Sequence, residues 1–274
     1  MARQLPSGEG DEQDDSWVLP AAPGVRLPWQ LRVEMGHAVG PLRLDLHFTL
    51  LHPWTVLFAP SGAGKTTVLR VIAGLERPER GRIAFERAGR SDVLTDTARG
   101  IFVPPYQRGV RLVSQRAALF SHRTVRGNVL YGFEHLARGR SEDRPLASWI
   151  EEILTLCRIA HLAHKRPDQL SGGERQRVAL ARALGAGRGR LLLLDEPFTG
   201  LDAAMREELI ADLRVWLARR AVPVLMVTHD LSEVFSADAE VLRMEAGKIV
   251  ATGRADVVLA TERASLLRRL GSLS

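Results

Sequence analysis

Two stretches near residue 30 alternate apolar and polar positions. The first covers residues 31–35, and the second covers residues 41–50, where every second residue from Leu42 to Leu50 is apolar. A period of two is typical of strands with one buried face. We therefore expect an antiparallel edge layer of strands at the start of the fold.

Short continuous apolar runs follow at residues 55–58, 110–113, 191–194 and 224–227. They alternate with helical patterns, as parallel strands buried on both faces do. The first run leads through a Gly-rich turn into a helical stretch at residues 65–73. The pattern predicts an α/β core with a parallel sheet, an antiparallel β-layer and a helical lobe inserted at about residues 116–170, where no strong strand signal occurs.

The first 28 residues are rich in Gly, Pro, Asp and Glu and have no apolar period, which predicts a poorly ordered tail over residues 1–28. We expect one folded domain over residues 29–274. The longest aliphatic run, residues 191–194, is far shorter than the roughly 18 to 20 residues that cross a bilayer. The N-terminus also lacks the basic start and apolar centre of a secretory signal, so we expect a cytoplasmic chain.

Charge and cysteine content argue against a nucleic-acid partner and against an internal disulfide. The net charge of +6 is almost entirely arginine, and the arginines are scattered without an aromatic platform, so we expect no nucleic-acid partner. Cys157 is the only cysteine, which excludes an internal disulfide. It lies in the apolar pattern of a helix expected at residues 148–165, and we interpret it as a buried, inert thiol.

A Gly-rich loop joins the first apolar run to its helix. In such a loop the backbone N–H groups and the helix N-terminus bind phosphate, a lysine reaches the β- and γ-phosphates, and a hydroxyl binds magnesium. An alanine replaces the first glycine of the pattern, at little cost unless that position needs a positive φ. An ordinary Gly-rich turn would not explain Gly-Lys-Thr in this frame. The expected phosphate-binding residues are Ala59, Pro60, Ser61, Gly62, Ala63, Gly64, Lys65, Thr66 and Thr67.

Two adjacent carboxylates, Asp195 and Glu196, follow the run at residues 191–194. The carboxyl ends of strands are where ligands bind in open α/β sheets. Asp195 would hold Mg²⁺ together with Thr66, and Glu196 would polarise the attacking water as general base. Alone, the acidic pair could be a solvated strand end; with the phosphate loop it indicates a catalytic centre.

Ser171 and Glu174 have the spacing of a capping box, which predicts a helix whose N-terminus could receive a phosphate. The whole segment, residues 170–184, reads LSGGERQRVALARAL and resembles the signature motif of ATP-binding cassette (ABC) ATPases. In that family the signature of one subunit closes over ATP held by the phosphate loop of another. The resemblance therefore implies a homodimer with two composite sites, in which Ser171, Gly172 and Gly173 contact ATP.

The resemblance assigns roles to three further residues. Gln115 matches the glutamine that joins the core to the helical lobe and contacts magnesium or the attacking water. Asp202 matches the loop that crosses the dimer interface, and His229 matches the switch histidine at the γ-phosphate. The adenine-stacking position stays open between His37 and Trp29, either of which could instead be an ordinary surface side chain.

Within the family, residues 100–132 resemble the ATPases of molybdate importers in sequence and spacing. Those ATPases usually carry a C-terminal oxyanion-binding domain, which we do not expect in a chain that ends at Ser274. Residues 119–131 follow Gln115 and lead into the lobe, so we expect them to dock a membrane subunit. Phe120 would be an exposed anchor there, or else a core aromatic.

The resemblance implies an importer ATPase at the cytoplasmic face of the membrane, peripheral to it. It would use ATP and Mg²⁺ to drive uptake of a small solute such as molybdate through separate permease subunits, and would work indirectly with a periplasmic or extracellular solute-binding protein. The alternatives are an exporter ATPase and a soluble ABC ATPase acting on nucleic acid or the ribosome. The single cassette, the lack of a heptad run and the single cysteine favour the transporter.

Overall fold

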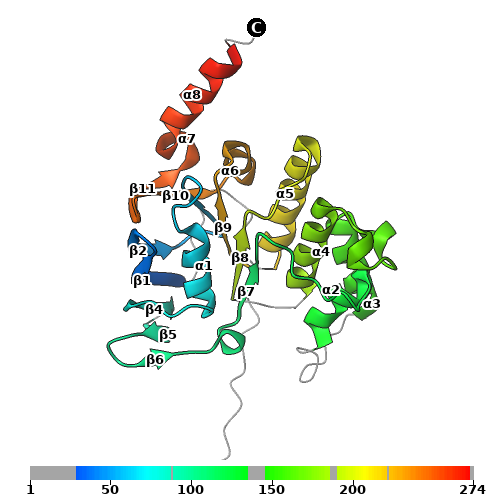
Figure 1. The fold of residues 1–274 in the computed structure, drawn as a ribbon, viewed down its shortest axis with the longest axis horizontal. Coiled ribbons are helices and arrows are strands. Elements are labelled where there is room, and N and C mark those ends of the chain that lie inside the picture. Colours follow the sequence, from blue (N-terminus) through cyan, green and yellow to red (C-terminus); the bar gives the residue numbers. More distant parts are fainter. Residues whose placement is uncertain (1–28, 88, 135–145, 186–189, 221, 272–274) are drawn as a thin grey trace, which may run out of the picture.

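The computed structural model describes residues 29–87, 89–134, 146–185, 190–220 and 222–271. The tail expected at residues 1–28 lies outside them. Two sheets and a group of helices form the molecule (Figure 1). The predicted α/β class, with its antiparallel layer and parallel sheet, is confirmed.

The antiparallel layer has the strand order β2-β1-β4-β5-β6. It consists of β1 (Gln30–Val39), β2 (Leu42–Leu50), β4 (Arg80–Arg87), β5 (Arg90–Asp96) and β6 (Ile101–Phe102). The alternation in β2 places Leu44, Leu46, Phe48 and Leu50 in the core. The expected edge layer is thus confirmed, and it is larger than the sequence pattern indicated.

The second sheet has the order β11-β10-β3-β9-β8-β7. It consists of β3 (Trp54–Phe58), β7 (Val110–Val113), β8 (Leu191–Asp195), β9 (Val224–Thr228), β10 (Glu240–Glu245) and β11 (Lys248–Arg254). The pairs from β10 to β7 are parallel, and only β11 runs antiparallel to its neighbour. All four predicted parallel strands are confirmed, and their carboxyl ends meet at one edge.

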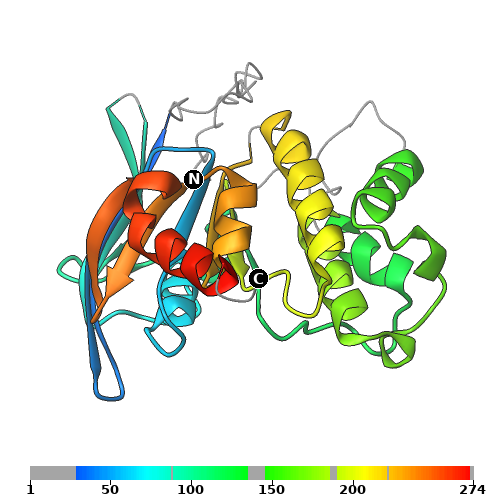
Figure 2. The same cartoon turned by 90° about the horizontal axis from the view of Figure 1, so that it is seen from above.

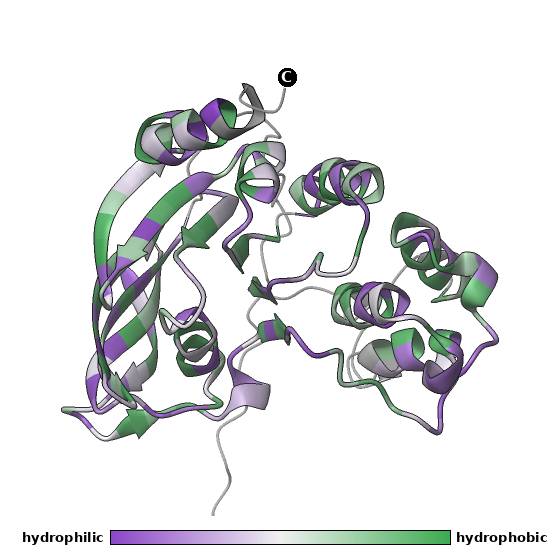
Figure 3. Cartoon of the chain, turned by 45° about the horizontal axis from the view of Figure 1, so that its top comes forward, coloured by the Kyte–Doolittle hydropathy of each residue, from purple (hydrophilic) through white to green (hydrophobic). Residues whose placement is uncertain are grey.

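Each face of the parallel sheet has its own core. Leu191 and Leu193 of β8 pack with the antiparallel layer and with α1 (Lys65–Ala73), which lies between the two sheets. Leu192 and Leu194 pack on the other side with α5 (Ala203–Ala218), α6 (Leu231–Ala237) and the helical lobe. Hydrophobic positions gather in the central strands accordingly (Figure 3).

The lobe side contains α2 (Val125–Glu134), α3 (Leu146–Leu156) and α4 (Gly172–Gly185), with single turns at Ala160–Leu162 and Pro167–Gln169. Figure 2 shows it beside α5 and away from the antiparallel layer. The helix expected through Cys157 is shorter than predicted, because Arg158 has a φ of 54° and turns the chain after Leu156. Burial raises the pKa of the Cys157 thiol to about 12, as an inert thiol requires.

The last described helices are α7 (Ala255–Val258) and α8 (Ala260–Gly271), which extend from β11. A single turn at Pro105–Gln107 precedes β7. Among the described residues, none of the helices has the length and apolar character needed to cross a membrane.

Candidate active site

The Gly-rich loop wraps the start of α1. Gly62 and Gly64 have φ angles of 80° and 88°, which an L side chain rarely adopts. Ala59 is buried and lies outside the positive-φ region, so its methyl group causes no backbone strain. The Lys65 Nζ atom donates hydrogen bonds to the carbonyls of Ala59 (2.7 Å) and Pro60 (3.0 Å). The amine is thus held inside the loop that is expected to bind phosphate.

Burial and nearby charged groups both affect the pKa of the Lys65 amine. Desolvation lowers the pKa of Lys65, and the nearby carboxylates of Glu196 and Asp195 oppose that shift. The Nζ atom lies 3.9 Å from Glu196 Oε1. A dianionic phosphate entering the loop would stabilise the ammonium form in the same way.

Asp195 ends β8 and is almost completely buried. Its Oδ1 atom accepts a hydrogen bond of 3.1 Å from the hydroxyl of Thr66, which joins the two residues expected at the metal. Burial raises the pKa of Asp195, the Thr66 bond lowers it, and the negative charge of Glu196 raises it further. A cation at this position would remove the cost of that buried charge.

The donor set fits Mg²⁺ rather than a metal held by protein alone. This ion prefers oxygen ligands and is usually bound by one or two carboxylates, waters and substrate phosphates. Thr66 and Asp195 present such oxygens side by side. In the described ranges no group of three or more His, Cys, Asp or Glu side chains could hold a metal ion.

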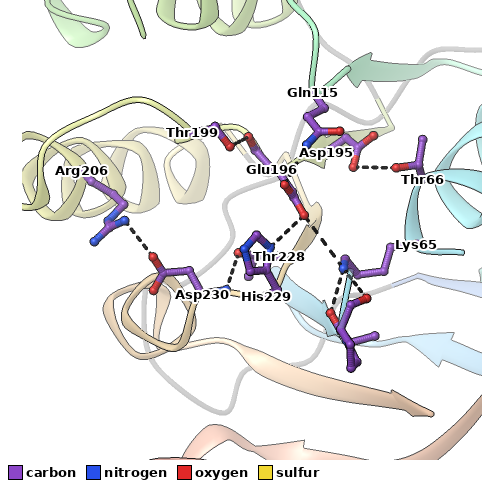
Figure 4. Close-up of polar contacts among 12 residues, drawn as sticks. Lys65, Thr66, Gln115, Asp195, Glu196, Thr199, Arg206, Thr228, His229 and Asp230 are labelled. Carbon is purple, nitrogen blue, oxygen red and sulfur yellow. Dashed lines mark hydrogen bonds and ion pairs between the residues drawn. The ribbon is translucent and has the colours of Figure 1, made fainter. Parts of the chain in front are cut away.

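Glu196 is the point at which the predicted catalytic residues meet (Figure 4). Its Oε2 atom accepts a 2.9 Å hydrogen bond from Gln115 Nε2, and its Oε1 atom lies 2.9 Å from His229 Nδ1. With Lys65, these residues come from α1 and from the ends of β7, β8 and β9. Their convergence follows from the parallel order of the strands.

The backbone of Glu196 has a φ of 46°, in the left-handed region that is unusual for a residue other than glycine. The Glu196 N–H donates to Val227 O (3.0 Å), and its carbonyl accepts from the Thr199 hydroxyl (3.0 Å). Such strained residues gather at functional sites. The sequence carried no signal for this conformation, because it depends on contacts with β9 and with the loop that follows.

The loop after β9 is tied to α5. Asp230 caps α6 by accepting from the Ser232 N–H (2.7 Å), and it also accepts from Arg206 Nη1 (2.8 Å). Asp202 caps α5 itself by accepting from the Met205 N–H (2.9 Å). Sequence reasoning missed Arg206, which links the helix that begins at Asp202 to the loop that carries His229.

The predicted capping box at the signature segment is confirmed. The Ser171 N–H donates to Glu174 Oε2 (2.7 Å), and the Glu174 N–H donates to Ser171 Oγ (3.2 Å). A Cβ atom at Gly173 would lie 2.8 Å from the carbonyl oxygen of Gly200, so glycine allows α4 to pack on the loop before Asp202. Ser171 and Gly172 are exposed.

The signature segment and the phosphate loop of one chain lie on opposite sides of the parallel sheet. Helix α4 belongs to the core on the lobe side, and α1 belongs to the core between the sheets. Figures 1 and 2 both show this separation. The exposed N-terminus of α4 and the chain's own Lys65 therefore belong to helices on different sides of the sheet.

The two candidates for adenine stacking are both occupied by other contacts. The His37 Nε2 atom lies 2.8 Å from Glu76 Oε1, and the ring of Trp29 packs edge-on against Phe85 with 5.2 Å between centroids. The structure therefore favours neither residue as the base-stacking side chain.

Known proteins are similar to this chain in sequence and in fold. A family model described as "ABC transporter" matches residues 45–199. The molybdenum import ATP-binding protein ModC of Albidiferax ferrireducens is 44% identical over 77% of this chain. The molybdate/tungstate import ATP-binding protein WtpC of Archaeoglobus fulgidus is 39% identical over 82% of this chain and 87% of its own length. The expected resemblance to molybdate importer ATPases is confirmed.

The chain spans 55% of the Albidiferax protein and 59% of the ModC protein of Mesorhizobium japonicum, so about half the length of these relatives is matched. Among solved structures, cbiO1 from Clostridium perfringens, described as part of the ABC transporter complex cbiONQ, is similar with a TM-score of 0.69 and 25% identity. The similarity covers 89% of this chain and 97% of that one.

Proposed function

Because the chain belongs to the ABC transporter family, we propose that it is the ATP-hydrolysing subunit of an importer and that two copies of it close over two ATP molecules. The observation that carries this proposal is the meeting of Lys65, Gln115 and His229 at the carboxylate of Glu196. The loop at residues 59–67 would bind the phosphates of ATP.

Hydrolysis needs a water held in line with the γ-phosphate and a group that accepts its proton. Glu196 takes the role of general base, with its two oxygens oriented by Gln115 and His229. Lys65 leaves the loop carbonyls for the phosphate oxygens. Thr66 and Asp195, with Gln115 nearby, would hold Mg²⁺, which neutralises developing charge on the phosphates when bound.

A second copy would complete each site. The exposed N-terminus of α4 offers Ser171 Oγ, the Gly172 and Gly173 N–H groups and a positive helix end, all of which suit the γ-phosphate. Asp202 would lie at the interface between copies. ATP would draw the two lobes together, and hydrolysis with phosphate release would let them part and move the permease subunits.

Permease docking is best supported at a cavity of about 200 Å³ between β7 and the lobe. It is lined in part by Arg111, Leu112, Ala118, Tyr131 and Arg182. Phe120 contacts the lining residue Tyr131, with 4.4 Å between ring centroids, and is half-buried, which lies between the exposed anchor and the core aromatic that the sequence left open. Burial lowers the pKa of Arg111 to about 10. Such a mixed apolar and cationic cavity suits a permease helix that carries an acidic side chain or presents its C-terminal end.

Filling the cavity provides a test of docking. Ala118 is exposed and lines it, so Ala118→Trp should keep basal ATPase activity but abolish stimulation by transported solute in the reconstituted complex. Ala264→Trp makes the same change at an exposed position of α8 and should leave stimulation intact. Normal stimulation of the Ala118→Trp complex would remove the cavity as docking surface.

We propose molybdate or a related tetrahedral oxyanion as the solute, imported from a periplasmic or extracellular binding protein with the ATPase at the cytoplasmic membrane face. The names of the molybdenum and molybdate/tungstate relatives support this proposal. Deleting the gene should abolish high-affinity molybdate uptake in a strain without another molybdate transporter, and the parent gene but not a Glu196→Gln version should restore it. Normal uptake in the deletion strain would reject the solute and leave the ATPase assignment standing.

A further inference from the structure

Arg108 is a fully buried arginine, 0% exposed, that none of the roles above uses. Burial lowers the pKa of its guanidinium to about 10, so the group still carries its charge at neutral pH. The N–H groups of the guanidinium donate hydrogen bonds to uncharged oxygens. Nε donates to Val103 O (2.8 Å), Nη1 to Val71 O (3.1 Å) and Ile72 O (3.0 Å), and Nη2 to Thr95 Oγ1 (2.9 Å).

Two of those acceptors are carbonyls in the last turn of α1. This end of a helix has unpaired carbonyls and negative potential, which a cation stabilises. Gly74 ends α1 with a φ of 78°, and a Cβ atom there would lie 2.3 Å from Arg108 Nε. The glycine therefore both turns the chain and leaves space for the guanidinium.

The remaining contacts come from the antiparallel layer. Thr95 lies on β5, Val103 follows β6, and the guanidinium carbon of Arg108 lies 4.9 Å from the centroid of the Phe102 ring. A hydrophobic side chain could fill this space without the cost of burying a charge. It could not fix a helix end, a strand and a loop by directed hydrogen bonds.

Arg108 also stands next to the strand that leads to the lobe. Only Gly109 separates it from β7, which ends two residues before Gln115 and pairs in parallel with β8, the strand that carries Asp195. In the other direction α1 is one short helix whose opposite end begins at Lys65. The guanidinium thus joins the helix of the phosphate loop to the strand of the glutamine.

We propose that Arg108 is a positioning residue: it sets the place of α1, with Lys65 and Thr66, relative to β7 and Gln115. The inference rests on the proposed ATPase function. Arg108 acts through these residues and does not itself touch ATP. Loss of its directed bonds shifts α1 against β7 while leaving the phosphate loop internally intact.

Arg108→Lys keeps the charge but cannot make the same set of bonds. We expect kcat to fall roughly tenfold, since a displacement of about 1 Å far from the chemistry can cost up to about 10²-fold. The Kd for ATP, measured with a fluorescent ATP analogue, should stay within about twofold, the scale on which distant sites act independently. Arg77→Lys is the matched control, because Arg77 is exposed and lies over the same Phe102 ring at 5.6 Å; its kcat should not change.

A double-mutant cycle with Gln115→Ala separates positioning from stability. If Arg108 acts through Gln115, the kcat loss of Arg108→Lys should largely vanish in the Gln115→Ala background, while its effect on Tm persists there. Should Arg108→Lys fail to fold, Thr95→Val removes one acceptor and should show a smaller loss of the same kind. A lowered Tm with unchanged kcat, or kcat losses that simply multiply, would overturn the proposal. If the parent chain itself hydrolyses no ATP, the proposed function fails first.

Discussion

Replacing Glu196 with Gln is expected to slow ATP hydrolysis by about 10²-fold or more, the scale of a lost general base. The amide has nearly the shape of the carboxylate, so ATP should still bind, but it cannot accept a proton from the attacking water. Closed dimers should accumulate with ATP. Phosphate release and gel filtration in the presence of ATP measure the two effects.

Glu207→Gln is the matched control, because Glu207 is an exposed residue of α5. Its turnover should equal that of the parent chain. A Glu196→Gln chain that hydrolyses ATP at the parental rate would show that Glu196 is not the base, whatever its contacts with Gln115 and His229.

The centre of the parallel sheet was predictable because β8 and β9 are buried on both faces. The continuous apolar run at residues 191–194, for example, matches β8 closely. The strands β4 and β5 escaped prediction because charged residues at their exposed positions break up the apolar signal, as in RGRIAFER. Their place in the layer is set by pairing with β1, a contact distant in sequence.

The residues of the candidate site could be predicted from motifs, but the contacts between them could not. Each motif lies at the end of a parallel strand or the start of a helix, so the topology brings Gln115, Asp195 and His229 to one edge. The left-handed backbone of Glu196 and the burial of Arg108 arise from residues far away along the chain. The pattern of apolar and polar residues along a short segment carries no information about contacts with distant residues.

The second large effect concerns the sharing of each ATP between two copies. Lys65→Ala removes the amine that we propose reaches the phosphates, and Ser171→Arg places a bulky side chain at the N-terminus of α4. Each variant alone should be inactive, because both sites of its symmetric dimer carry the lesion. In a mixed dimer, one site carries both lesions and the other carries neither.

The most direct test of the shared site is the ATPase rate of these two inactive chains after mixing, with mixed dimers verified by two affinity tags. Activity is expected to return, toward about a quarter of the parental rate if chains pair at random in two-fold dimers and the sites act independently. No return of activity in verified mixed dimers would contradict the claim that Lys65 of one copy and Ser171 of the other act on the same ATP.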